Sequence, residues 1–402
     1  MSAVNTPSPT GATSGFDALP PPPARGSWPA VVAVALGIFA IVTTEILPIG
    51  LLTSIGDTYA VSDGTAGLTM TLPGFVAAIA APLVTVATAR FDRRRMLAAF
   101  LLLLALANFL VAAAPSYWLV LVSRVLVGVT IGGFWSVGAG LAGRLVPART
   151  AGRATAVMFA AVPVGSVLGV PLGTLVGDAA GWRTAFAAMG GFTLAACAML
   201  VRTVPPLPAS ATTRPAALRA ALRGPGAGVA LALTFLLVLA HFGAYTYVTP
   251  FLEQVTRAGP ELVTVGLLVF GAAGTAGTFI GAAAVAHSPR AAFAGAAALL
   301  SLATLSLPAL GGSAVGALAL LALWGLAYGA VPVCSSASFA RAAPTAPEAA
   351  SVLFTASFQA TISLGALLGG VVVDHRSVSL ALTSAGVTAA AAVLVACWKR
   401  SV

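Results

Sequence analysis

Glu45 is an acidic side chain inside a long apolar stretch, where a carboxyl group can bind and release a proton. It lies in the segment TTEILPIG, Thr43–Gly50, and it is the only charged residue between Trp28 and Leu52. A carboxylate at the centre of a bilayer costs about 3 kcal/mol or more, so it needs either a partner or a proton. The sequence therefore suggests a proton-transfer role for Glu45.

Arg124 is the second charge that lies well inside an apolar stretch. Glu45 comes seven residues before Leu52, and Arg124 comes six residues after Trp118. At a helical rise of about 1.5 Å per residue, both side chains lie about 10 Å below the same membrane surface. We interpret them as a proton-coupling pair in which Arg124 binds the ionised Glu45. The alternative is a fixed structural ion pair.

The composition predicts the kind of element that positions these residues. Of the 402 residues, 59% are hydrophobic and only 7% are charged, whereas about a quarter of a soluble domain is charged. The sequence therefore predicts an all-α membrane protein. Twelve apolar runs have the length of about 20 residues that a membrane-spanning helix needs, and they cover 28–52, 66–88, 97–115, 118–141, 154–177, 184–202, 227–250, 261–286, 291–309, 314–338, 349–373 and 378–397.

The longest polar break divides these spans into two sets of six. The predicted order is a disordered tail (1–27), a first bundle (28–202), a linker (203–226), a second bundle (227–397) and a short tail (398–402). The bundles also resemble each other, because Pro48 ends the first span as Pro250 ends the seventh. Duplication of six helices is typical of secondary transporters, whose substrate site lies between the halves near the midplane.

The basic residues indicate the orientation in the membrane. With the N-terminus inside, sixteen Lys and Arg residues fall on one face and only Arg183, Arg257 and Arg376 on the other. The positive-inside rule therefore predicts that both tails lie in the cytoplasm. The net charge of +10 reflects these loops, and we expect no nucleic-acid partner.

Glycines recur along the fourth and fifth spans at intervals of four residues. Small residues at this spacing let a neighbouring backbone approach closely, so they indicate helix packing. Pro171 adds a bend that is relevant to movement between states. The predicted packing motif comprises Gly128, Gly132, Gly165, Gly169, Pro171 and Gly173.

The loop ARFDRRRML, Ala89–Leu97, joins the second and third spans. Asp92 beside Arg93, Arg94 and Arg95 predicts a gating latch that holds helix ends through charge-assisted hydrogen bonds. The alternative is an ordinary positive-inside cluster, which explains the arginines but leaves the acidic residue unexplained.

Polar and aromatic side chains within the spans are candidates for a substrate cavity, because aromatic rings stack on flat ligands. His241 is also a candidate for proton transfer. The alternative for each is packing inside the protein or contact with lipid. The candidates are Asn108, Phe134, Trp135, His241, Tyr245, Tyr247, Trp324, Tyr328, Phe358 and Gln359.

Four segments together resemble the major facilitator superfamily, within its twelve-helix drug:proton antiporter group. In the loop motif Asp92 is shifted from the family position, and Val127 replaces the usual glutamine three residues after Arg124. The segments are Thr43–Gly50, Ala89–Leu97, the R-x-x-x-G core from Arg124 to Gly128, and GVPLG (Gly169–Gly173) followed by GWRTAF (Gly181–Phe186). GGFWS (Gly132–Ser136) and RLVP (Arg144–Pro147) are most similar to purine-nucleoside exporters and the arabinose-efflux-like branch.

This resemblance implies an inner-membrane bacterial transporter, monomeric, that exports drugs, nucleosides or sugars in exchange for protons by alternating access. A uniporter and a proton symporter that imports a metabolite are the alternatives. The sequence has no Walker A loop, and His241, His287 and His375 are widely separated. We therefore expect no enzymatic activity, no cofactor and no metal. A membrane enzyme or assembly factor would need clustered His, Asp or Glu at one face.

Overall fold

The computed structural model describes residues 27–87, 91–138, 141–208, 222–224, 226–344 and 347–398. The predicted N-terminal tail up to residue 26, loop residues 88–90, most of the linker and residues 399–402 lie outside the described residues.

Twelve helices in the described part are long and apolar enough to cross a membrane, which confirms the predicted number. Their ends differ from the predicted ends by a few residues. The fifth span, for example, is expected at 154–177, whereas helix α8 runs from Ala148 to Ala180. Hydropathy marks the part of a helix that fits the bilayer, and a polar first turn such as that of α8 can stay helical beyond it.

The first bundle contains the first six spans and three short helices. Its elements are α1 (Trp28–Gly50), α2 (Leu52–Tyr59), α3 (Asp63–Ala66), α4 (Leu68–Ala87), α5 (Arg93–Ala112), α6 (Tyr117–Gly138), α7 (Ala142–Leu145), α8 (Ala148–Ala180) and α9 (Trp182–Thr203). Gly181 separates α8 from α9 with φ of 86°, a left-handed conformation that glycine adopts readily.

The second bundle contains the other six spans. Its elements are α11 (Ala227–Tyr245), α12 (Val248–Gln254), α13 (Pro260–His287), α14 (Pro289–Leu310), α15 (Ala314–Gly329), α16 (Val331–Ala342), α17 (Pro347–His375) and α18 (Val378–Trp398). Ser288 and Ser313 begin α14 and α15 by accepting hydrogen bonds from the backbone N–H groups of Ala291 and Gly316, at 3.3 and 3.1 Å. Such caps satisfy N–H groups that have no partner inside the helix.

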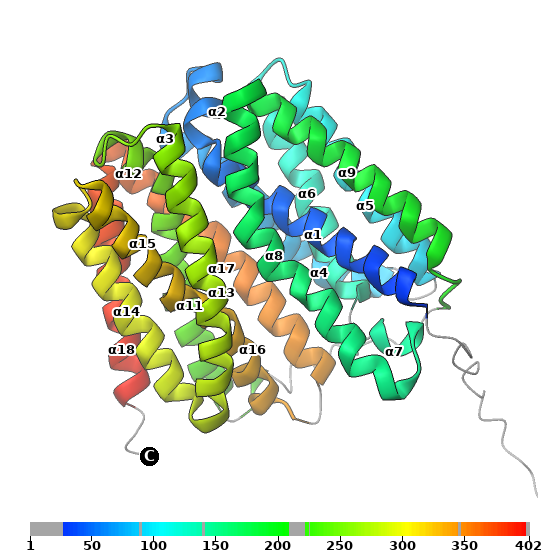
Figure 1. The fold of residues 1–402 in the computed structure, drawn as a ribbon. Helices are drawn as coiled ribbons and strands as arrows, with labels where there is room; N and C mark the ends of the chain where they lie inside the picture. The colour runs from blue at the N-terminus through cyan, green and yellow to red at the C-terminus, as the bar shows by residue number, and fades with distance from the viewer. Residues whose placement is uncertain are drawn as a thin grey trace, which may run out of the picture.

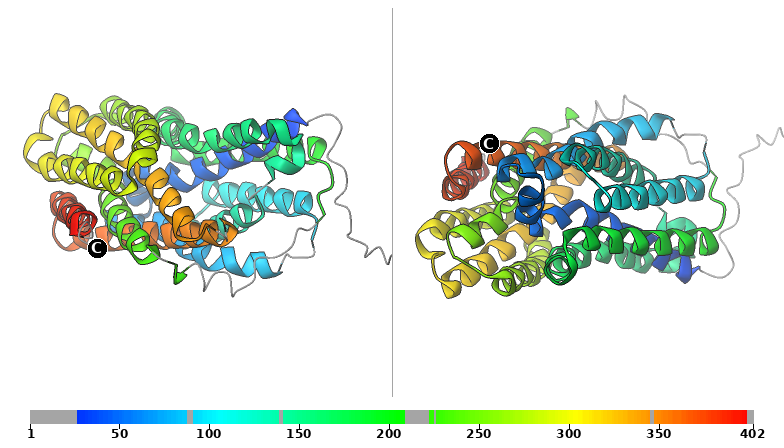
Figure 2. Two further views of the ribbon diagram at one scale, coloured as in Figure 1. Left: turned by 90° about the horizontal axis from the view of Figure 1, so that it is seen from below. Right: turned by 90° about the horizontal axis from the view of Figure 1, so that it is seen from above.

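The two bundles repeat the same packing pattern. In the first, α1 packs on α8, α4 on α6 and α5 on α9; in the second, the corresponding pairs are α11 with α17, α13 with α15 and α14 with α18. Figure 2 shows the bundles side by side in both end-on views, the first from blue to green and the second from yellow-green to red. The chain therefore forms two pseudo-symmetric six-helix bundles.

The two most extensive contacts between the bundles are those of α4 with α17 and of α8 with α13. They are equivalent under the repeat, because α4 corresponds to α13 and α17 to α8. We call the end of the molecule that carries α2, α3 and α12 the Gly64 end, and it is at the top of Figure 1. At this end one apolar core includes residues of both bundles, such as Leu52, Met70, Tyr247 and Leu252. The bundles are therefore closed against each other at the Gly64 end.

Candidate functional site

Glu45 lies on α1 and is held by a residue of the opposite bundle. Its Oε1 accepts a hydrogen bond from Nε2 of Gln359 on α17, at 2.9 Å. Gln359 is buried, at 7% exposure, whereas Glu45 remains partly exposed. A residue 314 positions away in the chain therefore supplies the partner that this carboxyl group needs.

Arg124 is fully buried on α6, but it does not bind the Glu45 carboxylate in this conformation. Its Nη1 donates to the backbone carbonyl of Thr44 at 3.0 Å, and its guanidinium lies 5.4 Å from the centre of the Phe186 ring. Nε and Nη2 have no hydrogen-bond partner among the described residues. The structure differs here from the expected ion pair, because Arg124 contacts the backbone of α1 while the Glu45 side chain points toward α17.

Thr44 fixes the rotation of α1 next to Glu45. Its hydroxyl accepts a hydrogen bond from Nδ2 of Asn108 at 3.0 Å, and its carbonyl accepts the one from Arg124. Thr44, Asn108 and Arg124 are all fully buried. Asn108 therefore anchors α1 to α5 inside the first bundle, and this anchoring directs the following residue, Glu45, toward the second bundle.

Five aromatic side chains of the second bundle form a cluster around His241. The His241 ring stacks on those of Tyr328 and Tyr245, with ring centres 3.3 and 4.9 Å apart, and on Phe270 at 5.8 Å. Trp324 donates its indole N–H to Nδ1 of His241 at 3.1 Å. Because Nδ1 accepts this bond, a neutral His241 carries its proton on Nε2.

Tyr328 differs from the other rings of this cluster in its surroundings. It is the partly exposed member of the cluster, and it lies within electrostatic range of Glu45. We call Glu45, Gln359 and Tyr328, together with the His241 cluster behind them, the Glu45 site. It combines a carboxyl group, an amide, a phenol and stacked rings between the two bundles.

The other cavity candidates are placed elsewhere. Phe134 is buried in the core of the first bundle, and Trp135 lies against Phe159. Tyr247 is buried and donates its hydroxyl hydrogen to the Ala366 carbonyl at 2.7 Å. Phe358, on the same helix as Gln359, lies 5.2 Å from the ring of Phe354.

The loop motif binds the segment that follows α9. Asp92 begins α5 by accepting from the backbone N–H of Arg95 at 3.1 Å, and it also accepts from the N–H of Leu207 at 2.7 Å. Arg93 donates its backbone N–H to the Leu207 carbonyl at 2.8 Å, and the Arg94 side chain donates to the Val201 carbonyl. These contacts all lie within the first bundle and the start of the linker.

The packing motif lies at two helix contacts inside the first bundle. A Cβ atom at Gly128 or Gly132 would lie 2.5 or 2.6 Å from the carbonyl oxygens of Pro73 or Ala77 on α4. The glycines of α8 contact α1 instead: Gly165 faces Val42, Gly169 faces Thr43 and Gly173 faces Leu47. Pro171 is buried between them, and its carbonyl accepts from the Thr174 hydroxyl at 2.8 Å.

Sequence reasoning missed the glycines where the bundles touch. A Cβ atom at Gly64 would lie 2.4 Å from the carbonyl oxygen of Gly370, and one at Gly74 would lie 2.5 Å from that of Gln359. These distances are too short for any side chain, so the backbones of the two bundles touch directly. No local pattern distinguishes them from other glycines, because the contact depends on a helix about 300 residues away.

Polar contacts between the bundles are grouped at the Gly64 end. The Thr249 hydroxyl donates to the Ile49 carbonyl at 2.9 Å, and the hydroxyls of Thr174 and Thr264 lie 3.0 Å apart. Three carboxylates also accept across the boundary: Asp374 from Ser62 and Gly64 at 2.6 and 2.8 Å, Asp63 from Gln254 at 3.0 Å, and Glu253 from Thr53 at 3.2 Å.

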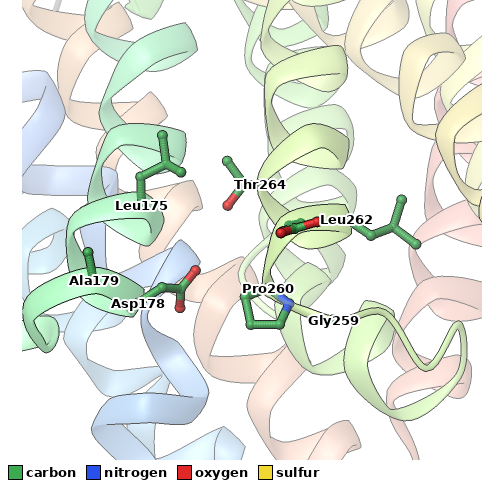
Figure 3. A pocket seen from close by; sticks show the side chains of 8 residues that line it. Leu175, Asp178, Ala179, Gly259, Pro260, Leu262 and Thr264 are labelled. Carbon is green, nitrogen blue, oxygen red and sulfur yellow. The ribbon is translucent and has the colours of Figure 1, made fainter.

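A hollow of about 650 Å³ also lies at this end, between α8 and α13. Figure 3 shows Asp178 and Ala179 on one side and Pro260 on the other, with Thr264 between the helices. The hollow is formed by the ends of the helices and does not include the Glu45 site. Among the described residues, including those that line the hollow, no three His, Cys, Asp or Glu side chains come together in a way that could hold a metal ion.

Comparisons with known proteins agree on the kind of molecule. The family model of the Major Facilitator Superfamily matches residues 34–353. The chain is 33% identical over 352 residues to the purine ribonucleoside efflux pump NepI of Salmonella paratyphi A, covering 88% of this chain and 89% of that protein. NepI of Escherichia coli O6:K15:H31 is 32% identical over 362 residues, covering 90% and 91%.

A solved structure shares the fold. It is that of a bacterial homologue of the human lysosomal transporter Spinster, in an inward-facing and unoccupied conformation. The TM-score is 0.68 with 16% sequence identity, and the match covers 91% of this chain and 94% of that one.

Proposed function

This chain belongs to the Major Facilitator Superfamily of membrane transporters, and from that premise we propose that it exports purine nucleosides or similar flat molecules in exchange for protons. It is a multi-pass membrane protein that transports small molecules. The direction of transport, the coupling to protons and the substrate class are the proposed parts.

The contact between Glu45 and Gln359 is the observation that carries the proposal. The carboxyl group lies inside the membrane helices, is partly exposed, and binds a side chain of the opposite bundle at 2.9 Å. An antiporter needs a group whose proton is exchanged as the bundles move, and ionisable residues within membrane helices commonly have this role. A fixed ion pair with Arg124 would have argued against it, and Arg124 binds Thr44 instead.

The His241 cluster supports a flat substrate. Stacking of a nucleobase on an aromatic side chain contributes about 1–3 kcal/mol and tolerates different bases. Tyr328 is the partly exposed ring of this cluster and lies within electrostatic range of Glu45. The relatives described as purine ribonucleoside efflux pumps transport molecules of this shape.

The proposed setting is a bacterial inner membrane, with a monomer whose two tails lie in the cytoplasm. The biased distribution of basic residues supports this orientation. The Gly64 end then faces outward, and the conformation described here is closed toward the outside. Loading of substrate from the cytoplasm fits such a state.

The test uses inverted membrane vesicles that contain the full-length chain and a radiolabelled purine nucleoside. An imposed proton gradient should drive accumulation by the wild type, and a protonophore should abolish it. Glu45→Gln should lose this accumulation, whereas Glu261→Gln, which removes an exposed carboxylate at the Gly64 end, should retain it. Unchanged accumulation by Glu45→Gln would show that proton coupling through this residue is wrong, and flow that ignores the gradient would indicate a uniporter.

A further inference from the structure

We infer that Gln359 is the positioning residue through which the contact between the bundles decides whether Glu45 carries a proton. This inference rests on the proposed proton coupling. It adds the residue that links protonation of Glu45 to the movement of one bundle against the other. The sequence alone indicates only a substrate-cavity role for Gln359.

The position of Gln359 is tied to the closed contact between α4 and α17. The Gln359 carbonyl oxygen lies so close to Gly74 that a Cβ atom there would come within 2.5 Å of it. Ser363, one turn further along α17, contacts the same glycine, at 2.2 Å from that Cβ position. The hydrogen bond from the Gln359 amide to Glu45 therefore occurs together with direct contact between the backbones of α4 and α17.

Two other groups lie within electrostatic range of Glu45: Arg124 on α6 of the same bundle and the Tyr328 phenol on α15 of the opposite bundle. Arg124 is bound to the Thr44 carbonyl in the same bundle, and Gln359 is the hydrogen-bond partner of Glu45 among the described residues. A carboxyl group at this depth needs a partner or a proton. When α17 leaves α4, Glu45 loses its amide donor while Arg124 stays with the first bundle, and a proton takes the place of the amide.

This exchange gives the proton a direction. Opening of the Gly64 end separates α4 from α17, so Glu45 takes up its proton in the state that is open at that end. Closing brings the Gln359 N–H back to the carboxylate oxygen, and the proton leaves in the state closed at the Gly64 end. With the Gly64 end outside, protons move inward, as the proposed export of substrate requires.

The test compares Gln359→Met with wild type, because methionine has nearly the same length but donates no hydrogen bond. Exchange of labelled for unlabelled nucleoside at equal pH is measured beside accumulation, and accumulation is divided by the exchange rate, so that a loss of coupling is separated from a loss of substrate binding. Gradient-driven accumulation should fall about tenfold or more, as expected for loss of one hydrogen bond to a charged group, and its pH profile should shift. Ser357→Ala is the control on α17, because the Ser357 hydroxyl donates only to the Phe354 carbonyl of the same helix, and it should keep both activities.

Two further variants make the outcome decisive. In the Glu45→Gln background accumulation is already lost, so the pH profile of nucleoside exchange is measured instead; Gln359→Met should leave that profile unchanged there, because Gln359 acts through Glu45, and a shift would overturn the inference. Gly74→Ala separates α4 from α17 without changing either side chain, and it should shift the pH profile in the same way even if Gln359→Met does not fold.

The failures of the two proposals are distinguishable. If Glu45→Gln abolishes accumulation but Gln359→Met and Gly74→Ala keep the wild-type pH profile, the role of Gln359 is overturned and proton coupling stands. If Glu45→Gln itself leaves accumulation unchanged, the proposed function fails and the role of Gln359 fails with it.

Discussion

Asp374, at the end of α17, accepts a hydrogen bond from the backbone N–H of Gly64 at 2.8 Å, and the two residues belong to different bundles. The second oxygen of the same carboxylate accepts from the Ser62 hydroxyl at 2.6 Å. One side chain thus binds the short helix α3 at two points. Because α3 leads directly into α4, this contact lies at the end of the same α4–α17 boundary that holds Gln359 against Glu45.

Loss of the Asp374 carboxylate should favour opening of the Gly64 end. In Asp374→Ala the N–H of Gly64 and the hydroxyl of Ser62 lose their acceptor, which at this exposed position should change the balance by about 1 kcal/mol, or roughly fivefold. Spin labels on Ser54→Cys and Gly312→Cys, in a Cys397→Ser background, report the distance between the bundles at this end. Asp178→Ala is the control, and an equal change in both variants would contradict the specific role of Asp374.

A side chain at Gly64 should have a larger effect in the same direction. Gly64→Val places atoms 2.4 Å from the Gly370 carbonyl, where the backbone has to move. The labelled distance at the Gly64 end should therefore shift almost completely to the longer value. Gly295→Ala, where a Cβ meets no atom within 4 Å, should leave the distance unchanged. A wild-type distance distribution in Gly64→Val would show that the backbones do not touch there.

Acidification should stabilise the closed Gly64 end through Glu253. Partial burial raises the pKa of Glu253 above its ordinary value of 4.5; the Thr53 hydroxyl opposes this rise, and the carboxylates of Asp63, Asp57 and Asp178 add to it. Glu253 therefore binds a proton more tightly in the closed form than in an open form where water surrounds it.

The contribution of Glu253 to the closed population should thus grow as the pH falls through the raised pKa and stop growing below 4.5, where both forms are protonated. A Glu45→Gln background removes the opposite contribution that is proposed for Glu45. The label distances measured across this pH range report the population. Glu253→Gln should remove this part of the pH dependence. If the label distances of Glu253→Gln still depend on pH as in the wild type, the pH dependence belongs to other groups.

Tyr328 should contribute to substrate affinity through its ring. Tyr328→Ala removes a stacking surface worth about 1–3 kcal/mol, which corresponds to roughly a 5- to 150-fold increase in the Kd for a purine nucleoside. Tyr328→Phe keeps the ring and should bind close to wild type. Isothermal titration of the purified protein measures both, and equal affinities for Ala and Phe would place the nucleobase away from this cluster.

Removal of the Trp324 N–H should weaken binding less. Trp324→Phe keeps an aromatic ring in the cluster but takes the donor from Nδ1 of His241, so the tautomer of the histidine is no longer fixed. A net loss of about 0.5–1.5 kcal/mol is expected for one hydrogen bond, or roughly 2- to 12-fold in Kd. The same calorimetric titration measures this Kd. An unchanged Kd in Trp324→Phe would show that the tautomer of His241 does not affect substrate binding.

The sequence by itself determined the membrane spans and identified the acidic residue that lies within the first of them. Backbone groups inside a bilayer have to find partners within the same helix, so each run of about 20 apolar residues predicts one span, and twelve were found. Glu45 was identifiable because an acidic residue in such a run is expensive and needs a reason. The repeated prolines and glycines also indicated two similar halves, and the same three helix pairs occur in each half.

Only the tertiary structure decided which residues meet. The depth of a residue along a helix follows from counting residues, and it suggested Arg124 as the partner of Glu45. The direction in which a side chain points, however, depends on how the helix is rotated against its neighbours. Thr44 and Asn108 fix that rotation for α1, which gives Arg124 a backbone carbonyl and gives Glu45 the amide of Gln359. Gln359 comes within reach because Gly74 lets two backbones from distant parts of the chain touch, and no local sequence pattern contains that contact.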